Sequence, residues 1–400
     1  MQYTIKQAFK YIKFRDIVAI LKAMAIFPFA IIAKMFIRNF WLVCEDMNEA
    51  RDNGYWFFKW VRENKPGQKI AYAINKSSRD YEKVRHLGKI VQYGSVAHWF
   101  WYIVADKNIS SQKGGKPNAA VCYLFEVVFK MRGNNRVFLQ HGITINDGKW
   151  LYYSNTRMRL FITAAKPEDE FIKGKFGYPQ GNVKLLGFCR FDNLHNCEVD
   201  KDLILVMPSW RNWLGRESSE NAHMDFAKTE YCIKWNEFLH SDKLTQLLET
   251  YDKKLIFFPH RNMQKFISHF STASGRIEVA DGKKYDVQEL LKTAALLVTD
   301  FSSVFFDFAY MRKPVIFYQF DEKQFREKQY AQGYFDYHNT VLGEWSNNID
   351  NALDLMEKQI QAGFPFVAEN IIQEFFPLYD ASNWERTYNS ITYLSDCSKL

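Results

Sequence analysis

The chain has 400 residues, a formal charge of +8 at pH 7 and an isoelectric point near 8.9. Apolar residues make up 47% of it and aromatic residues 17%, which excludes a disordered chain and supplies enough material for two buried cores. The excess of basic residues favours anionic partners such as nucleotides, phosphorylated polymers or an acidic membrane surface. The basic residues are dispersed and no recognised nucleic-acid-binding motif occurs, which argues against a nucleic-acid partner.

The cysteines give no sign of a disulfide framework or a zinc site. The six cysteines form no Cys-x-x-Cys pair, and no His-x-x-x-His segment accompanies Cys189 and Cys197. We therefore expect buried, reduced thiols in a cytosolic setting. No Walker-type phosphate loop and no cluster of carboxylates beside a glycine-rich loop is present. The sequence indicates no resident metal, and Mg²⁺ bound together with a substrate stays open.

The first 38 residues are both basic and apolar. Their longest uncharged run, residues 23–33, is shorter than the ~20 residues that span a bilayer and contains Pro28. No small-residue cleavage site follows it. Aliphatic and phenylalanine side chains are surrounded by Lys6, Lys10, Lys13, Arg15, Lys22, Lys34 and Arg38. We expect residues 1–38 to lie on an anionic membrane face, and the alternative is a helix pair packed on the first domain.

Short apolar segments alternate with helical patterns along the rest of the chain. Up to Asn196, strands are predicted at FWLVCED, KIAYAI, KIVQYG, RVFLQHG, RLFITAA and VKLLG, helices over residues 48–63 and 98–105 and from KPEDEF onward, and a loop at SSQKGGKPN. Beyond Asn196, strands are predicted at LILVMP, KLIFFP, RIEVAD, LLVTD and PVIFY, and helices over residues 229–250, at VQELLKTA and at SSVFFDFAYMRK. Such alternation is typical of parallel sheets covered by helices on both faces.

The predicted fold class is therefore α/β, with two Rossmann-like doubly wound domains that face a cleft and an N-terminal basic amphipathic helical segment. The predicted boundaries are residues 1–38 for the membrane-associating segment, 39–196 for the N-terminal domain and 197–400 for the C-terminal domain. The final helical stretch, from Asn383, is expected to pack back on the N-terminal domain.

In open parallel sheets, ligands bind beyond the carboxyl ends of the strands. The polar residues that follow predicted strands are Gln140, His141 and Gly142 in the first domain, and Ser209, Trp210, Arg211, His260, Arg261, Asp300, Ser302 and Ser303 in the second. Imidazole, guanidinium and hydroxyl groups at a helix start suit phosphate oxygens, so these strand ends predict a diphosphate clamp. Simpler roles remain for several of them: a plain N-cap for the serines, a solvated side chain for His260 or Arg261, and packing for Trp210.

Five segments resemble a known family in order and spacing. LQHG, LLGFCRFDNL, MPSWR, FFPHRN and VTDFSSVFFDFAYMRKPVIFYQFD are similar to the CDP-glycerol glycerophosphotransferase family of teichoic acid and capsule polymerases. The resemblance extends from residue 40 to residue 336 and is most specific over residues 299–321. It implies a glycosyltransferase-B architecture, a donor held mainly by the second domain, and a peripheral position on the cytoplasmic face of the membrane.

The resemblance also implies a reaction. The hydroxyl of a lipid-linked or polymer acceptor attacks the β-phosphorus of CDP-glycerol, CMP leaves, and no further cofactor is required. By similarity His141 is the general base, and His260 with Arg261 stabilises charge on the diphosphate and the departing CMP. Ser209, Arg211, Asp300, Ser302 and Ser303 complete the donor site. Candidate contacts to the donor or the acceptor are Gln140, Gly142, Arg190, Trp210 and Asp307.

The sequence departs from the family pattern in two places. Residues 140–146 read QHGITIN where many members read Trp-His-Gly-x-Pro-Leu-Lys, and Cys189 stands where proline is common. The first departure concerns the acceptor side, so CDP-ribitol stays an alternative donor and capsule synthesis an alternative to wall teichoic acid. Two further alternatives are a nucleotide-sugar glycosyltransferase of the same fold and a non-catalytic peripheral membrane protein that binds polymer.

Overall fold

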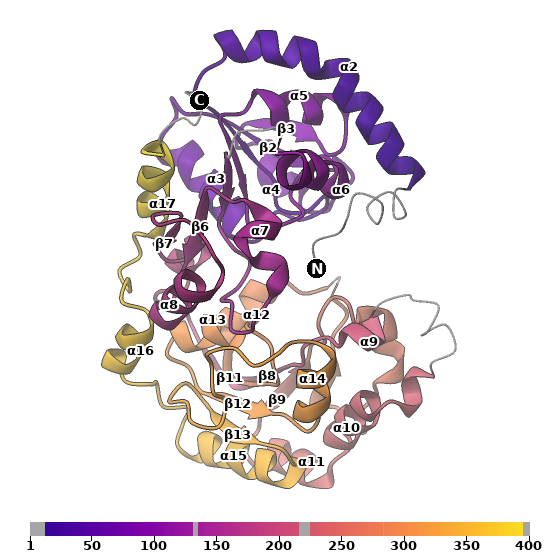
Figure 1. Ribbon diagram of the computed structural model, residues 1–400. Coiled ribbons are helices and arrows are strands. Elements are labelled where there is room, and N and C mark those ends of the chain that lie inside the picture. Colours follow the sequence, from indigo (N-terminus) through magenta and orange to yellow (C-terminus); the bar gives the residue numbers. More distant parts are fainter. Residues whose placement is uncertain (1–12, 131–134, 216–224, 283, 395–400) are drawn as a thin grey trace. The chain divides into compact units, whose positions relative to one another are not determined.

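The computed structural model describes residues 13–130, 135–215, 225–282 and 284–394. The chain divides into two compact units (Figure 1). The first comprises Met1–Ile143, Lys149–Asn193 and Leu378–Leu400, and the second Thr144–Gly148 and Leu194–Pro377. Each unit is built on one sheet whose strands pair in parallel, with helices packed around it. The predicted α/β class with two parallel sheets is confirmed.

The sheet of the first unit has the strand order β3-β2-β1-β4-β5-β6-β7. Its strands are β1 (Phe40–Val43), β2 (Lys69–Ile74), β3 (Lys89–Gln92), β4 (Lys107–Ser110), β5 (Arg136–Phe138), β6 (Leu160–Thr163) and β7 (Val183–Leu185). The helices around it are α2 (Phe14–Phe36), α3 (Asn53–Asn64), α4 (Tyr81–Arg85), α5 (Val96–Val104), α6 (Ala119–Tyr123) with a π-helical turn (Leu124–Val128), α7 (Tyr153–Thr156), α8 (Lys166–Lys175) and α17 (Asn383–Thr392), with 3₁₀ turns at Lys149–Leu151 and Cys189–Asn193.

Strand β4 lies between β1 and β5, although the apolar pattern does not predict it. Its sequence, KNIS, has only one apolar residue, yet all of its residues are buried. Two of the polar side chains donate to carbonyl groups: Lys107 Nζ to the carbonyl oxygen of Leu394 at 3.0 Å, and Asn108 Nδ2 to that of Tyr102 at 3.1 Å. Hydrogen bonding thus allows a polar segment to occupy the interior of the sheet.

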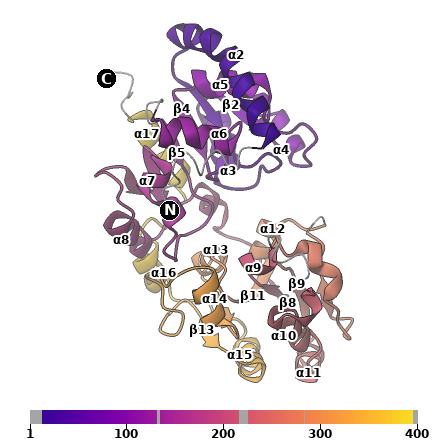
Figure 2. The ribbon, with the colours of Figure 1, turned by 45° about the vertical axis from the view of Figure 1, so that its right-hand side comes forward.

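Helix α2 packs on the first unit through small side chains. Ala19, Ala23 and Ala30 form its buried face, and the helix lies beside α5 and α6 (Figure 2). It continues through Pro28 as one 23-residue helix, where the sequence allowed a helix pair. The most apolar 18-residue window has a mean hydropathy of 2.1, so by length and composition α2 also fits a membrane span. The uncharged run of residues 23–33 is shorter than this helix, which extends past Lys22 and Lys34, so the run alone did not indicate a length that could span a membrane. Residues 1–12 lie outside the described part of the chain.

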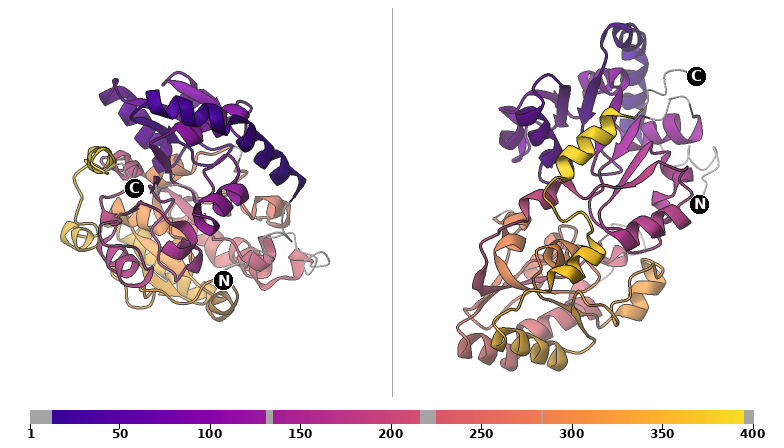
Figure 3. Two further views of the ribbon diagram at one scale, coloured as in Figure 1. Left: turned by 45° about the horizontal axis from the view of Figure 1, so that its top comes forward. Right: turned by 90° about the vertical axis from the view of Figure 1, so that its left-hand side faces the viewer.

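Helix α17, from the C-terminal end of the sequence, belongs to the first unit (Figure 3). Tyr388 contacts two tryptophan rings, Trp41 of β1 at a centroid distance of 5.3 Å and Trp60 of α3 at 5.8 Å. The backbone N–H of Trp384 donates to Asp192 at 3.0 Å. The last helix therefore completes the core of the first unit.

The sheet of the second unit has the order β10-β9-β8-β11-β12-β13. Its strands are β8 (Asp200–Met207), β9 (Lys254–Phe257), β10 (Ile277–Val279), β11 (Ala294–Thr299), β12 (Val315–Tyr318) and β13 (Glu344–Ser346). Its helices are α9 (Asn212–Gly215), α10 (Glu230–Leu239), α11 (Asp242–Thr250), α12 (Val287–Thr293), α13 (Phe305–Tyr310), α14 (Glu322–Lys328), α15 (Ile349–Gln361) and α16 (Glu369–Phe375), with 3₁₀ turns at Phe226–Lys228 and Gln264–His269.

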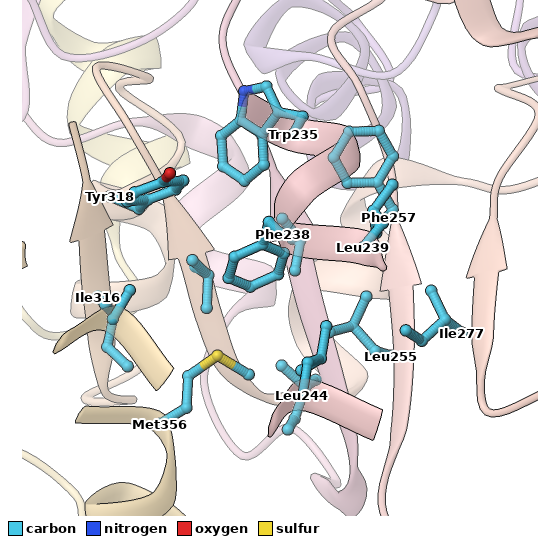
Figure 4. Close-up of a cluster of buried hydrophobic side chains, with 14 of the residues drawn as sticks. Trp235, Phe238, Leu239, Leu244, Leu255, Phe257, Ile277, Ile316, Tyr318 and Met356 are labelled. Carbon is cyan, nitrogen blue, oxygen red and sulfur yellow. The ribbon is translucent and has the colours of Figure 1, made fainter. Parts of the chain in front are cut away.

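The stretch predicted as one helix over residues 229–250 is two helices, α10 and α11. The break falls at Ser241, whose side chain accepts the N–H of Leu244 and so starts α11. Helix α10 places Trp235 and Phe238 over the sheet, where they contact Tyr318 of β12 (Figure 4). This cluster forms the centre of the second core.

We predict that Trp235→Ala destabilises the second unit by about 3–5 kcal/mol, because Trp235 is fully buried and its loss leaves a cavity. The control is Ile233→Ala on the same helix, where the side chain is 44% exposed and the expected change is within about 0.5 kcal/mol. Denaturant unfolding measures both. Equal effects of the two substitutions would contradict the packing of α10 described above.

Candidate active site

His141 follows β5 at the carboxyl edge of the first sheet. The residue before it, Gln140, has a positive φ of 62°, a conformation that costs free energy for any residue other than glycine. The Gln140 side chain is buried and donates to the carbonyl oxygen of Ile162 at 2.9 Å and to Glu168 Oε1 at 2.8 Å. Gln140 therefore anchors the turn that presents His141, whose side chain is 64% exposed.

Asp52 contacts the His141 ring directly. Its Oδ2 lies 2.6 Å from His141 Nδ1, and its Oδ1 accepts the N–H of Asn53 as the N-cap of α3. Sequence periodicity places the helix start near residue 48, but α3 begins at Asn53. The reason is Glu45, which follows β1 and accepts the N–H groups of Arg51, Asp52 and Tyr55 at 3.0, 3.1 and 2.6 Å. The shorter helix leaves Asp52 at the edge of the sheet, beside His141.

Arg190 closes this arrangement from the 3₁₀ turn Cys189–Asn193. Its Nη1 lies 3.2 Å from Asp52 Oδ1 and donates to the carbonyl oxygen of His141 at 2.8 Å. Asn53 holds the same turn, since its Oδ1 accepts the N–H of Arg190 at 3.0 Å and its Nδ2 donates to the carbonyl oxygen of Gln140 at 2.7 Å. Burial acts to raise the pKa of Asp52, but His141 and Arg190 outweigh it and hold this pKa below its usual range.

The contact between Asp52 and His141 determines where the ring carries its hydrogen. An ionised carboxylate only accepts hydrogen bonds, so Nδ1 of His141 must be the protonated nitrogen. Nε2 of the neutral ring then has a free lone pair on an exposed side chain. This is the arrangement of a general base.

In the second unit, the predicted residues follow three adjacent strands, β9, β8 and β11. The backbone N–H of His260 donates to the carbonyl oxygen of Pro208 at 3.2 Å, and Trp210 stacks on the His260 ring at a centroid distance of 6.2 Å. His260 Nδ1 accepts the N–H of Asn262 at 3.2 Å. Because a backbone N–H only donates, the hydrogen of a neutral His260 ring is on Nε2.

Arg211 is fully buried rather than directed into solvent. Its Nε and Nη2 donate to the two carboxylate oxygens of Asp321 at 2.7 and 2.8 Å, and Nη1 donates to Ser209 Oγ at 2.9 Å. Nη2 also lies 2.9 Å from Asp300 Oδ2, as an ion pair without the geometry of a hydrogen bond. Burial acts to lower the pKa of Arg211, but Asp321 and Asp300 outweigh it and raise this pKa.

Asp300 is also buried, and its Oδ1 accepts the N–H groups of Ser209 at 2.8 Å and Phe301 at 2.6 Å. These contacts make Arg211 and Asp300 the support beneath Ser209. Ser209 itself is buried as well. Direct contacts of Arg211, Asp300 or Ser209 with a donor stay predictions.

The remaining candidates of the second unit differ in exposure. Arg261 is exposed, Ser302 and Ser303 are half-buried, and Asp307 is buried within α13. Ser302 Oγ accepts the N–H of Val304 at 3.4 Å, but neither serine caps α13, which begins at Phe305. This helix has only six residues, so it contributes a smaller dipole to an anion site than the predicted longer helix.

The candidate residues therefore form two groups, one in each unit. In the first unit Gln140, His141 and Arg190 gather around Asp52, with Gly142 next along the chain. In the second unit the other candidates follow β8, β9 and β11, except Asp307, which lies within α13. That His141 and His260 act on one diphosphate stays a prediction. Among the described residues, no group of three or more His, Cys, Asp or Glu side chains is arranged to hold a metal ion.

Several residues of these groups were not found from the sequence: Glu45, Asp52, Asn53 and Asp321. Asp52, Asn53 and Asp321 lie tens of residues or more from the candidate residues that they contact, as Asp52 does from His141, so no local spacing connects them. The available signal was only that Glu45 lies in a predicted strand and that Asp321 comes shortly after one.

Solved structures with this fold include a polymerase and an epimerase. The wall teichoic acid polymerase TagF matches with a TM-score of 0.62 and 13% identity, over 95% of this chain and 98% of that one. The UDP-GlcNAc 2-epimerase of Methanocaldococcus jannaschii matches with a TM-score of 0.52 and 13% identity, over 88% of this chain and 99% of that one. These likenesses establish the glycosyltransferase-B type of fold.

Sequence comparison places the chain within one family of this fold. The profile of the family described as CDP-Glycerol:Poly(glycerophosphate) glycerophosphotransferase matches residues 30–393, so the chain belongs to this family of transferases. It is 31% identical over 374 residues to the minor teichoic acid biosynthesis protein GgaB of Bacillus subtilis, covering 89% of this chain and 40% of that protein. The teichoic acid glycerol-phosphate transferase of Staphylococcus aureus is 24% identical over 279 residues, 66% of this chain and 65% of that protein. The chain thus spans less than half of GgaB, and the family predicted from the five segments is confirmed.

We predict that Arg211→Met destabilises the second unit by about 3–5 kcal/mol, because Asp300 and Asp321 are left buried without their cation. Denaturant unfolding gives the free energy. The control is Lys228→Met, which removes a pair with Asp225 whose side chains are 84% and 52% exposed and which contributes at most about 1 kcal/mol. Unchanged stability together with lost donor affinity would instead make Arg211 a donor ligand.

Proposed function

We propose that the chain transfers glycerol phosphate from CDP-glycerol to a hydroxyl group of a polyol-phosphate or glycan acceptor, in teichoic acid or capsule-type polymer synthesis, with release of CMP. The observation that carries this proposal is the exposed imidazole of His141, with its Nε2 lone pair free and a buried carboxylate behind Nδ1, in a member of the glycerophosphotransferase family. The family's name supplies the donor, and the histidine supplies the chemistry.

On the acceptor side, His141 acts as the general base. The acceptor oxygen forms a bond to the β-phosphorus while its proton moves to His141 Nε2. The bond between this phosphorus and the bridging oxygen breaks, and CMP leaves with the electron pair. The imidazolium that forms is stabilised by Asp52, 2.6 Å from Nδ1. No resident metal or other cofactor takes part in this scheme, and a Mg²⁺ ion bound with the donor is compatible with it.

On the donor side, His260 donates through Nε2 to diphosphate oxygens and stabilises the charge that develops on CMP. Arg261 is exposed beside it, and Trp210 fixes the ring by stacking. Ser302 and Ser303 add hydroxyl groups at the end of the adjacent strand. Arg211 and Asp300 support this edge from below.

A second donor is favoured by one relative. The teichoic acid poly(ribitol-phosphate) polymerase of Bacillus spizizenii is 27% identical over 296 residues, 70% of this chain and 44% of that protein. CDP-ribitol is therefore the alternative donor. Purified protein incubated with CDP-glycerol or CDP-ribitol and a polymer-phosphate acceptor should release CMP from one of them. UDP release from a UDP-sugar would indicate a glycosyltransferase, and binding of polymer without turnover a non-catalytic protein.

We predict that His141→Ala and His260→Ala each lower kcat by about 10²–10⁴-fold with the fold retained, because the first removes the general base and the second a donor to the developing charge, both at an edge outside the core. CMP release measures the rate, and circular dichroism checks the fold. Matched controls are His86→Ala in the first unit and His240→Ala in the second, both exposed histidines away from the strand ends named above. Wild-type turnover of either test variant would remove that histidine from the mechanism.

We also propose that α2 binds the anionic cytoplasmic face of the membrane, peripherally. Large apolar side chains exposed along it are Phe14, Ile17, Leu21, Met24, Phe27, Phe29, Ile31, Ile32, Met35 and Phe36. Basic residues flank them at Lys13, Arg15, Lys34 and Arg38. The opposite face is held by the first unit, since Ala19 and Ala23 pack in its core and Lys22 Nζ donates to the carbonyl oxygen of Gly94 at 3.0 Å. A helix held in this way lies on a bilayer rather than across it.

The double substitution Met24→Glu/Phe27→Glu is expected to weaken vesicle binding more than tenfold, because each apolar side chain contributes roughly 1.5–3 kcal/mol when it leaves water. Flotation with vesicles containing phosphatidylglycerol measures the binding. The control is Tyr393→Glu, which changes an 83% exposed side chain elsewhere in the first unit. Wild-type protein that resists extraction at alkaline pH would show a membrane span instead, and equal binding by both variants would exclude this face.

A further inference from the structure

The buried pair Asp52 and Arg190 has no role in the family resemblance beyond a candidate ligand contact of Arg190. We propose that this pair is a positioning device for His141: Asp52 fixes the ring with Nε2 outward, and Arg190 fixes Asp52 and the backbone of His141 together. This proposal rests on the proposed general-base role of His141, and it replaces the ligand contact expected for Arg190.

The first argument is the contrast in exposure. Asp52 and Arg190 are each 6% exposed, whereas the His141 side chain they hold is 64% exposed. A charged pair is buried at a cost that good geometry must offset, and here the pair supports an exposed ring at the edge of the sheet. Packing also immobilises Arg190, because its guanidinium carbon lies 4.9 Å from the ring centroid of Phe188 and 5.2 Å from that of Phe191.

The second argument is that the hydrogen bonds among Asp52, Arg190 and His141 form a closed network. Arg190 Nη1 reaches Asp52 Oδ1 at 3.2 Å and the carbonyl oxygen of His141 at 2.8 Å, while Asp52 Oδ2 reaches the His141 ring at 2.6 Å. Side chain and main chain of His141 are therefore fixed by one carboxylate and one guanidinium. With both its carbonyl group and its Nδ1 atom held, His141 loses the rotation about its side-chain bonds that would turn Nε2 away from an acceptor.

The third argument concerns charge. The imidazolium formed during the reaction gains the carboxylate of Asp52 as its partner, whereas Arg190 moderates how strongly this carboxylate retains the proton. Without Arg190, Asp52 would hold the imidazolium too firmly, and without Asp52, the cation of Arg190 would oppose its formation. Loss of either member of the pair therefore changes the charge balance at the ring in the opposite sense.

Other titratable groups reach this arrangement only indirectly. Glu45, behind Asp52, accepts backbone N–H groups of Arg51, Asp52 and Tyr55, and Glu168 of α8 accepts from the side chain of Gln140. Within the described part of the chain, Asp52 and Arg190 are the charged groups that bond to His141 itself. Substitutions at these two positions should therefore change the pH dependence in opposite directions.

The test is the pH profile of kcat/KM for CMP release by the full chain. Asp52→Asn should lower kcat by about 10²–10⁴-fold and leave the donor KM within about threefold. The acid limb of its profile should move to lower pH, because the imidazolium loses its partner. Arg190→Met should move the same limb to higher pH, and Arg190→Lys, which keeps the cation, should restore it toward the wild type.

The matched control is Asp169→Asn, which removes a buried carboxylate, 7% exposed, that bonds to Thr163 and Lys173 instead of His141. Its profile should keep the wild-type limb. Shifts of the same sign for Asp52→Asn and Arg190→Met, or no shift in either, would overturn the proposal, because a purely structural role predicts lost activity without opposite shifts.

A measurement independent of turnover separates this inference from the proposed function. In ¹⁵N-histidine-labelled wild-type protein, the nitrogen shifts of His141, assigned by comparison with His141→Ala, should show hydrogen on Nδ1 of the neutral ring. Hydrogen on Nε2 would overturn the positioning role even if the Asp52 variant fails to fold. Hydrogen on Nδ1 together with full activity of His141→Ala would support the positioning contact and reject the general base.

Discussion

Each unit depends on one buried carboxylate at the end of an interior strand. Parallel strands buried on both faces leave backbone groups without partners only at their ends, and the loops that begin there must satisfy them. In the first unit Glu45, fully buried, accepts three N–H groups from the loop that starts α3. In the second, Asp300, also fully buried, accepts the N–H groups of Ser209 and Phe301. Glu45 thus fixes the loop that carries Asp52 and Asn53, and Asp300 fixes the loops that begin after β8 and β11.

The space around Glu45 shows how tightly this is arranged. A Cβ atom on Gly54 would lie 2.8 Å from Glu45 Cγ, so the first turn of α3 has no room for a side chain there.

The two units balance the charges of their buried carboxylates differently. Asp300 is compensated by Arg211, which also binds Asp321 and is closed to solvent, whereas the Asp52–Arg190 pair opens onto His141. The first arrangement supports a surface, and the second serves an exposed reactive group.

Residues that follow apolar strands were predictable, and residues that meet across the fold were not. The runs before His141, His260 and Asp300 are apolar enough to mark their strands, so the edge positions of these residues follow from the pattern. Strand β4 was not predicted because its burial depends on hydrogen bonds to Leu394 and Tyr102 rather than on apolar side chains. The burial of Arg211 was not predicted either, because its partners Asp300 and Asp321 lie about 90 and 110 positions further along the chain. Only the folded chain shows that a basic residue after a strand is neutralised.

Neighbours within their own units give the two histidines opposite hydrogen-bonding states. His141 has its Nδ1 hydrogen directed to Asp52 and its Nε2 lone pair free, whereas His260 uses its Nδ1 lone pair for the N–H of Asn262 and keeps the hydrogen on Nε2. A general base needs the first state, and a donor to a leaving phosphate needs the second. Because every one of these contacts lies within a single unit, the two hydrogen-bonding states do not depend on how the units are arranged. The proposed division between base and donor therefore rests on a local property of each strand end.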